Sequence, residues 1–314
     1  MPLTVIRDPK PGAPDAVVAI GSFDGVHLGH RALLARVVDE ARQLGAVPAV
    51  LTFEPLPREL LFPDRAPPRI FTLSAKLHAF AEAGIGIAYV CRFTREFAAL
   101  TPEDFARRLR ELHGARRVLV GKDFRFGARR AGDVDFLAAQ GARLGFEVET
   151  LATVADGDER VSSTRVREAL AGGDLALAAR LLGRPYAICG RVVHGAKLGR
   201  NLGFPTANIA LPPGRPVMTG VFAVKCAGAA TRGLEGVASL GYKPVVARNG
   251  PPTLEAYLFD FSGDLYGRRL SIEFLKKLRD EAKYASLDEL VAQIRLDCEA
   301  ARDYFRGKRG PDGE

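Results

Sequence analysis

Short apolar runs alternate with stretches of helical periodicity through the first half of the chain. Apolar runs predict strands at residues 16–20, 47–53, 87–93, 117–121 and 146–152. Between them, helical spacing predicts helices at residues 30–44, 73–83 and 134–144, and Thr101-Pro102 predicts a further helix start. Strands that alternate with helices indicate a doubly wound, Rossmann-like α/β domain with a parallel sheet.

The pattern changes after residue 182. Short strands are predicted at residues 187–193, 220–226, 236–240, 253–261 and 269–275, separated by Gly and Pro turns, which is typical of a small β-barrel or sandwich. A last helix begins at Ser286, where Glu289 completes a capping box. Its apolar positions predict one buried face, made of Leu287, Leu290, Val291, Ile294 and Cys298. We therefore expect two domains, residues 1–182 and 183–314.

Composition narrows the functional class only slightly. The 314 residues, 47% of them apolar, suit two globular domains, and the net charge of +8 favours anionic partners such as nucleic acid, anionic lipid or phosphorylated small molecules. No segment is apolar enough to cross a bilayer, and the start lacks a signal-peptide pattern. The four cysteines lie far apart without a C-x-x-C, so we expect no zinc site, no disulfide framework and a cytoplasmic location.

The turn after the first predicted strand, G-S-F-D-G-V-H-L-G-H, holds two of the five histidines. His27 and His30 are three residues apart and share one face of a helical turn. A helix start binds phosphate well, imidazoles there can donate to phosphate oxygens in a transition state, and Gly29 lets a nucleotide approach the backbone. Two unrelated histidines at a helix start are the alternative.

Several segments, in order, extend this motif. The string at residues 21–30, with T-F-E-P-L-P-R-E at 52–59, G-K-D-F-R-F-G at 121–127 and V-S-S-T-R-V-R at 161–167, resembles the adenylyltransferase module of bacterial bifunctional riboflavin kinase/FAD synthetases. The resemblance implies that His27 and His30 are catalytic and that Asp123 lies beside the flavin. It also implies a nucleotide site made of Gly21, Phe23, Gly25, Gly29, Arg160, Ser163, Thr164 and Arg165. From the residues alone, Ser163 and Thr164 suit either a phosphate site or a plain helix cap.

One position departs from this pattern. Leu56 stands where the family has His, and leucine can neither donate a hydrogen bond nor carry charge. The departure motivates an alternative in which the chain is a riboflavin kinase with a weakened or lost adenylyltransferase site.

A second motif follows the first strand of the barrel. Gly195, Gly199 and Gly203 recur every four residues around Lys197, which suits either a flap over phosphates or an ordinary surface loop. Thr206 and Asn208 are two apart, so in an extended segment they face the same side and offer oxygen ligands that suit Mg²⁺.

The P-T-A-N sequence in this glycine frame resembles riboflavin kinase modules. The resemblance implies that Thr206 and Asn208 hold Mg²⁺ with the phosphates of ATP, that Gly195, Lys197, Gly199 and Gly203 bind the nucleotide, and that Glu255 is the catalytic base. Arg279, Glu281 and Tyr284 match the family's flavin side. Residues 239–245 read S-L-G-Y-K-P-V where the family has N-I-G-x-R-P-T, which alters several polar groups.

We therefore expect an enzyme that phosphorylates riboflavin to FMN and adenylylates FMN to FAD, with ATP as co-substrate and Mg²⁺ as cofactor. Its partners are small molecules, and neither a membrane nor a nucleic acid is expected. A basic RNA-binding module on a nucleotidyltransferase fold is the alternative from another class, although the chain lacks a run of stacking aromatics. The oligomeric state stays open.

Overall fold

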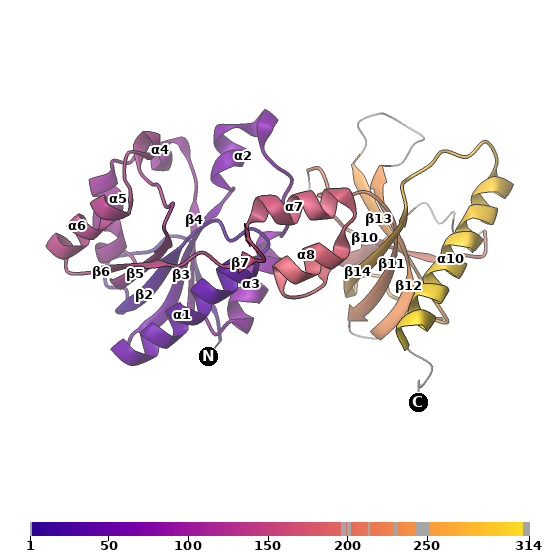
Figure 1. Ribbon diagram of the computed structural model, residues 1–314, viewed down its shortest axis with the longest axis horizontal. Coiled ribbons are helices and arrows are strands. Elements are labelled where there is room, and N and C mark those ends of the chain that lie inside the picture. The colour runs from indigo at the N-terminus through magenta and orange to yellow at the C-terminus, as the bar shows by residue number, and fades with distance from the viewer. Residues whose placement is uncertain are drawn as a thin grey trace. The chain divides into compact units, whose positions relative to one another are not determined.

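The computed structural model describes residues 2–195, 199, 202–212, 214–228, 231–242 and 251–309. The chain forms two compact units, coloured indigo to magenta and pink to yellow in Figure 1. The first unit contains residues 1–67 and 71–163, and the second contains residues 68–70 and 164–314.

A six-stranded parallel sheet forms the centre of the first unit and confirms the predicted α/β class. The strand order is β1-β4-β3-β2-β5-β6, so the order reverses between β2 and β5. Ligands of such sheets bind beyond the carboxyl ends of strands at that reversal. The strands are β1 (Thr4–Ile6), β2 (Ala16–Ile20), β3 (Val47–Glu54), β4 (Ile87–Arg92), β5 (Ala115–Gly121) and β6 (Glu147–Leu151).

Helices connect these strands and cover both faces of the sheet. The long ones are α1 (Leu28–Leu44), α3 (Leu73–Glu82), α5 (Pro102–Glu111) and α6 (Val134–Leu144), and Figure 1 shows α1 and α3 on the opposite face from α5 and α6. Short elements complete the unit: α2 (Pro57–Leu61), η1 (Pro63–Arg65), α4 (Arg95–Ala98), η2 (Ala128–Arg130), β7 (Ala155–Asp156) and β8 (Glu159–Arg160).

Local capping explains where the helices begin. The hydroxyls of Thr72 and Thr101 each accept a backbone N–H three residues on, at 3.1 Å, and the Asp133 carboxylate does the same at 2.9 Å. These side chains satisfy N–H groups that the helix itself leaves unpaired. At the other end, Gly45 and Gly145 adopt the left-handed conformation that stops α1 and α6.

The second unit is a closed antiparallel barrel, as predicted, with strand order β10-β13-β12-β11-β14-β9. Its strands are β9 (Tyr186–Val193), β10 (Thr206–Ile209), β11 (Gly220–Gly228), β12 (Thr231–Tyr242), β13 (Pro252–Leu258) and β14 (Arg269–Arg279). Helix α8 (Leu175–Leu182) packs on β9 and β14, and α10 (Leu287–Arg309) packs on β11, β12 and β14. Helix α7 (Ser163–Gly172) begins at the last residue of the first unit.

The second unit, residues 68–70 and 164–314, includes most of α7 and all of α8, and the expected domain boundary at residue 182 stays a prediction. The structure differs from the sequence-based expectations on the last helix. On α10, Leu287 is 56% exposed, and the buried positions lie further along, at Asp297, Cys298, Ala301 and Phe305. The predicted face was therefore wrong at its first residue. In the part of the chain that the structure describes, no helix has the length and apolar character needed to cross a bilayer.

Candidate active sites

The loop from Ser22 to His27 joins β2 to α1 at the reversal point of the sheet. Phe23 and Val26 have positive φ angles of 50° and 41°, and Gly25 between them has φ of 85°. Non-glycine residues in this region are strained, and such strain persists only where the surroundings hold it. The Asp24 carboxylate accepts the Phe71 backbone N–H at 2.9 Å, and the Asp24 carbonyl accepts the Ser163 hydroxyl at 2.8 Å.

His27 and His30 are stacked on each other at the start of α1. Their ring centroids are 3.7 Å apart with an interplanar angle of 18°, and His27 Nδ1 accepts the backbone N–H of His30 at 3.4 Å. A Cβ atom at Gly29 would lie 3.2 Å from His27 Cε1, so glycine leaves room for this ring. The His30 Nδ1 atom is buried and has no hydrogen-bond partner among the described residues. A polar atom in that state is a candidate for contact with a ligand.

The surroundings of His30 keep its imidazole uncharged. Burial lowers the pKa of His30 well below its usual value, and electrostatic interactions with His27, Lys76 and Arg160 lower it further. At neutral pH the ring therefore carries one N–H and one free lone pair. In this form the ring can donate one hydrogen bond to a phosphate oxygen.

Asp123 and Arg160, two further predicted site residues, form a two-bonded ion pair with N···O distances of 2.9 and 3.2 Å. The hydrogen bonds from Arg160 are the main cause that lowers the pKa of Asp123. Asp123 follows β5, and Arg160 ends the β7–β8 hairpin that leads to Ser163. The structure thus brings the predicted flavin-side carboxylate to a predicted phosphate-side arginine.

The other predicted nucleotide residues are placed as follows. Gly21, Phe23 and Gly25 lie at the end of β2 and in its loop, and the Phe23 ring is buried 5.2 Å from the His30 ring. Thr164 and Arg165 follow Ser163 on the first turn of α7, in the second unit, where Thr164 is exposed and Arg165 is half-buried. Leu56, where the family has His, is buried and caps α2 only through its backbone N–H, which donates to Glu59 at 2.9 Å.

In the barrel, the second predicted group comes together across two neighbouring strands. Asn208 on β10 lies directly opposite Glu255 on β13, and the Thr206 hydroxyl donates to Glu255 Oε2 at 3.3 Å. All three side chains are half-buried. The predicted same-side arrangement of Thr206 and Asn208 thus places a hydroxyl, an amide and a carboxylate in one cluster.

Two glycines of the predicted nucleotide loop, Gly195 and Gly199, lie against this cluster. A Cβ atom at Gly195 would lie 2.5 Å from the Asn208 amide group, and one at Gly199 would lie 2.4 Å from the Phe204 carbonyl and 3.4 Å from Thr206 Oγ1. Gly203 has a positive φ of 86°. Lys197 lies outside the described residues. The Thr206 hydroxyl and Asn208 amide oxygens are hard ligands, and the glycines keep side chains away from them. These residues therefore fit Mg²⁺ with bound phosphate.

The predicted flavin-side residues of the barrel also lie together. The Arg279 guanidinium donates to both carboxylate oxygens of Asp297 at 2.7 Å and lies over the Tyr284 ring, 5.9 Å from its centroid. Glu281 accepts the backbone N–H of Tyr242 at 3.4 Å. The Tyr284 hydroxyl is buried and has no partner among the described residues. The arginine is therefore held in place beside an aromatic face.

Two residues with clear structural roles were missed by the sequence analysis. Asp297 is only 5% exposed although it is charged, and Lys76 on α3 is completely buried. The signal for Asp297 was its position next to Cys298, on the predicted buried face of the last helix. Lys76 gave no such signal, because the carbonyl to which it donates, that of Ser22, is 54 residues away.

Comparison with known proteins agrees with this division into two sites. Residues 10–165 match the family model of FAD synthetase, and residues 182–305 match that of riboflavin kinase. The bifunctional riboflavin kinase/FMN adenylyltransferase of Escherichia coli (strain K12) is 47% identical over 290 residues, which is 92% of each chain. The protein of the same description from Pseudomonas fluorescens is 44% identical, covering 93% of this chain and 94% of that one.

A crystal structure from Streptococcus pneumoniae, described as a macrolide-efflux protein, shares 30% identity and a TM-score of 0.78, covering 96% of this chain and 98% of its own. Both catalytic domains are thus present, which favours the two-activity prediction over the kinase-only alternative. The chain belongs to the family of bifunctional riboflavin kinase/FMN adenylyltransferases.

Proposed function

We propose that this chain converts riboflavin to FMN at the barrel cluster and FMN to FAD at the paired histidines, using ATP in both steps. The observation that carries the proposal is that each unit contains its own group of reactive side chains. His27 and His30 are stacked in the first unit, and Thr206 bonds to Glu255 beside Asn208 in the second.

In the kinase step, the ribityl 5′-hydroxyl oxygen of riboflavin attacks the γ-phosphorus of ATP, and the bond to the bridging oxygen breaks to release ADP. Glu255 takes the hydroxyl proton and orients the oxygen for attack. Thr206 and Asn208 would hold Mg²⁺ with the phosphates, and the bound ion supplies charge neutralisation. Gly195, Lys197, Gly199 and Gly203 form the loop over the nucleotide, and Arg279, Glu281 and Tyr284 bind the flavin.

In the adenylyl step, a phosphate oxygen of FMN attacks the α-phosphorus of ATP, and pyrophosphate leaves. His27 and His30 donate hydrogen bonds to the phosphate oxygens as negative charge develops on them. Arg160, Ser163, Thr164 and Arg165 bind the phosphates, and Asp123 lies beside the flavin. The glycines of the loop, Gly21, Gly25 and Gly29, leave the backbone open to the nucleotide next to Phe23.

We also propose that the enzyme acts in the cytoplasm on small molecules. All four cysteines are free thiols, which suits a reducing compartment. The positive charge then attracts ATP and FMN, and no nucleic-acid partner is needed to explain it.

The test uses the purified full-length protein with riboflavin, ATP and Mg²⁺, and separates the flavins by chromatography over time. We expect FMN to rise before FAD. Glu255→Gln should lower FMN formation by about 100-fold or more while FMN still becomes FAD, and His30→Ala should do the reverse. The spared activity of each variant is the control for folding. Loss of both activities in either variant would contradict two separate sites, and tight, salt-dependent RNA binding without flavin products would favour the RNA alternative.

A further inference from the structure

Lys76 on α3 is the only lysine that is fully buried in the described part of the chain. Lysine is almost never fully buried, because removing its ammonium from water is costly unless polar groups replace the water. Its position is therefore constrained by what the ammonium contacts.

The Lys76 Nζ atom donates to the Ser22 carbonyl oxygen at 3.3 Å, and the Thr52 hydroxyl donates to the same oxygen at 3.4 Å. Ser22 is the first residue of the strained loop that leads to His27. Two side chains from different elements, α3 and β3, thus hold the start of the loop, while Asp24 fixes its middle. The hydrogen bond from the Lys76 ammonium therefore helps to hold the loop in its strained conformation.

The same charge also acts on His30. The groups that act electrostatically on this ring include His27 on its own turn, Lys76 from α3 and Arg160 from the β7–β8 hairpin, which itself pairs with Asp123. Asp24 lies in the adjoining loop, with one carboxylate oxygen bonded to the Phe71 N–H. Lys76 is fully buried, and electrostatic effects are screened least where water is excluded.

We propose that Lys76 is a positioning residue of adenylyl transfer: it fixes the Ser22–His27 loop through the Ser22 carbonyl and contributes to the electrostatic environment of His30. This inference rests on the proposed adenylyl-transfer site and adds to it a residue that does not touch the substrate. It predicts two separable effects of removing the ammonium, one on loop geometry and one on the protonation of His30.

The experiment compares full-length wild type with Lys76→Met, Lys76→Arg and Thr52→Val. For each, FMN-to-FAD conversion is measured as kcat/KM against pH, and riboflavin-to-FMN conversion by the same preparation serves as the folding control. We expect Lys76→Met to lower kcat/KM for FAD formation by roughly 10- to 100-fold, since misplacing reacting groups by about 1 Å has effects of that size. The acidic limb of its pH profile should move to higher pH, because His30 would then accept a proton more readily.

Thr52→Val is the matched control, because it removes the other donor to the Ser22 carbonyl without changing charge. It should lower the rate and leave the acidic limb in place, and Lys76→Arg should also keep the limb. If Lys76→Met does not fold, Lys76→Gln replaces it, with the same shift expected. If the wild type makes FAD but the acidic limb of Lys76→Met does not move, the proposed role of Lys76 is overturned while the adenylyl-transfer site stands. A wild type that makes no FAD would overturn the proposed site itself.

Discussion

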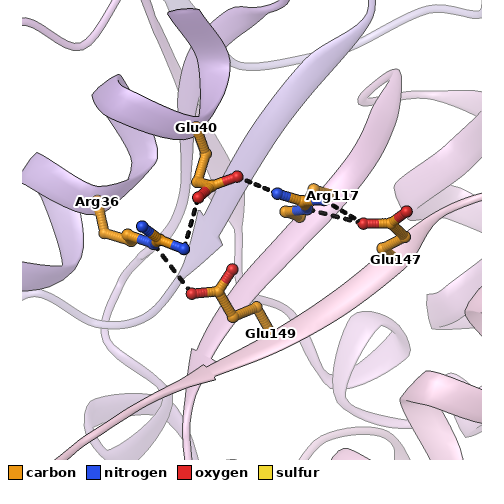
Figure 2. A network of polar contacts seen from close by, with 5 residues as sticks. All are labelled: Arg36, Glu40, Arg117, Glu147 and Glu149. Atoms are coloured by element: carbon orange, nitrogen blue, oxygen red, sulfur yellow. Dashed lines mark hydrogen bonds and ion pairs between the residues drawn. The ribbon is translucent and has the colours of Figure 1, made fainter. Parts of the chain in front are cut away.

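Replacing Arg117 by methionine tests how α1, the helix that presents His27 and His30, is held on the sheet. Glu40 on α1 is only 2% exposed, and it is bound by Arg36 from its own helix and by Arg117 from β5 (Figure 2). Arg36 also pairs with Glu149, and Arg117 with Glu147, both on β6. The five residues form a chain of ion pairs in which Glu40 is the only fully buried member.

Glu40 and Arg117 form the central ion pair of this chain. We expect removal of one partner to lower the free energy of unfolding by a different amount from removal of the other. Breaking a buried ion pair costs about 3–5 kcal/mol when it leaves a buried charge uncompensated. Arg117→Met leaves the Glu40 carboxylate buried, with Arg36 at 2.6 Å as a remaining partner. We therefore expect a loss of stability at the lower end of this range, about 3 kcal/mol. Glu40→Leu leaves both arginines with a remaining carboxylate and access to water, so we expect less than about 2 kcal/mol.

Thermal unfolding followed by calorimetry measures both effects. A loss of about 3 kcal/mol lowers the melting temperature of a domain of this size by roughly 6–12 °C. Arg116→Met is the matched control, because Arg116 is the neighbouring residue on β5 and pairs only loosely, at 3.7 Å, with the half-exposed Asp15. FMN-to-FAD activity of Arg117→Met should be lost at a lower temperature than its riboflavin kinase activity.

The double variant Glu40→Leu/Arg117→Met gives the decisive comparison. If the cost of Arg117→Met arises from a stranded carboxylate, removing that carboxylate must recover part of it, and the double variant should be more stable than Arg117→Met alone. The reasoning is refuted if the double variant is less stable than Arg117→Met, or if Arg116→Met is as destabilised as Arg117→Met.

Three further predictions concern the sites. Gly195→Ala should abolish most riboflavin kinase activity, because its Cβ would lie 2.5 Å from the Asn208 amide; Gly172→Ala, where nothing lies within 4 Å, should leave it unchanged. Asp297→Asn should raise KM for riboflavin more than it lowers kcat, because Arg279 loses a charged partner beside Tyr284; an unchanged KM in steady-state assays would contradict this. Burial lowers the pKa of both His30 and His113, so the unfolded chain binds more protons below its ordinary histidine pKa of about 6.5. The stability of the first unit should therefore be complete above that pH and fall as the pH drops below about 6.5, and His113→Phe should reduce the fall; a melting temperature that is flat or rising towards acid would be the contrary result.

Most of the fold followed from local signals. Residues 16–20 form β2 as predicted, because five consecutive apolar residues suit a strand buried on both faces. Thr101 and Pro102 predicted the start of α5 because a hydroxyl cap and a proline at the first position act within one turn. Strand β10 was expected only as an extended segment, since its four residues are too few to show a period.

The sequence-based predictions failed where the environment of a residue is set by segments that are distant along the chain. The apolar spacing of α10 gives the direction of its buried face but not how far the barrel extends beneath it, so Leu287 was expected inside and is exposed. Lys76 sits in an ordinary helical sequence, and only the fold brings it to a loop more than fifty residues away. The candidate site residues that lie in sequence motifs could be predicted from the sequence. The charged residues that hold them in place, Lys76 and Asp297, could not.

This distinction bears on the absence of the family's histidine at Leu56. The leucine is buried at the start of α2, where only its backbone is used as a polar group. Hydrogen bonds from Thr52, Phe71, Lys76 and Ser163 hold the strained loop that leads to the stacked histidines, and none of these bonds involves the Leu56 side chain. An imidazole missing at position 56 therefore leaves these hydrogen bonds of the loop in place. We expect FAD formation to persist in the wild type and Leu56→His to change its rate without changing the order of the products.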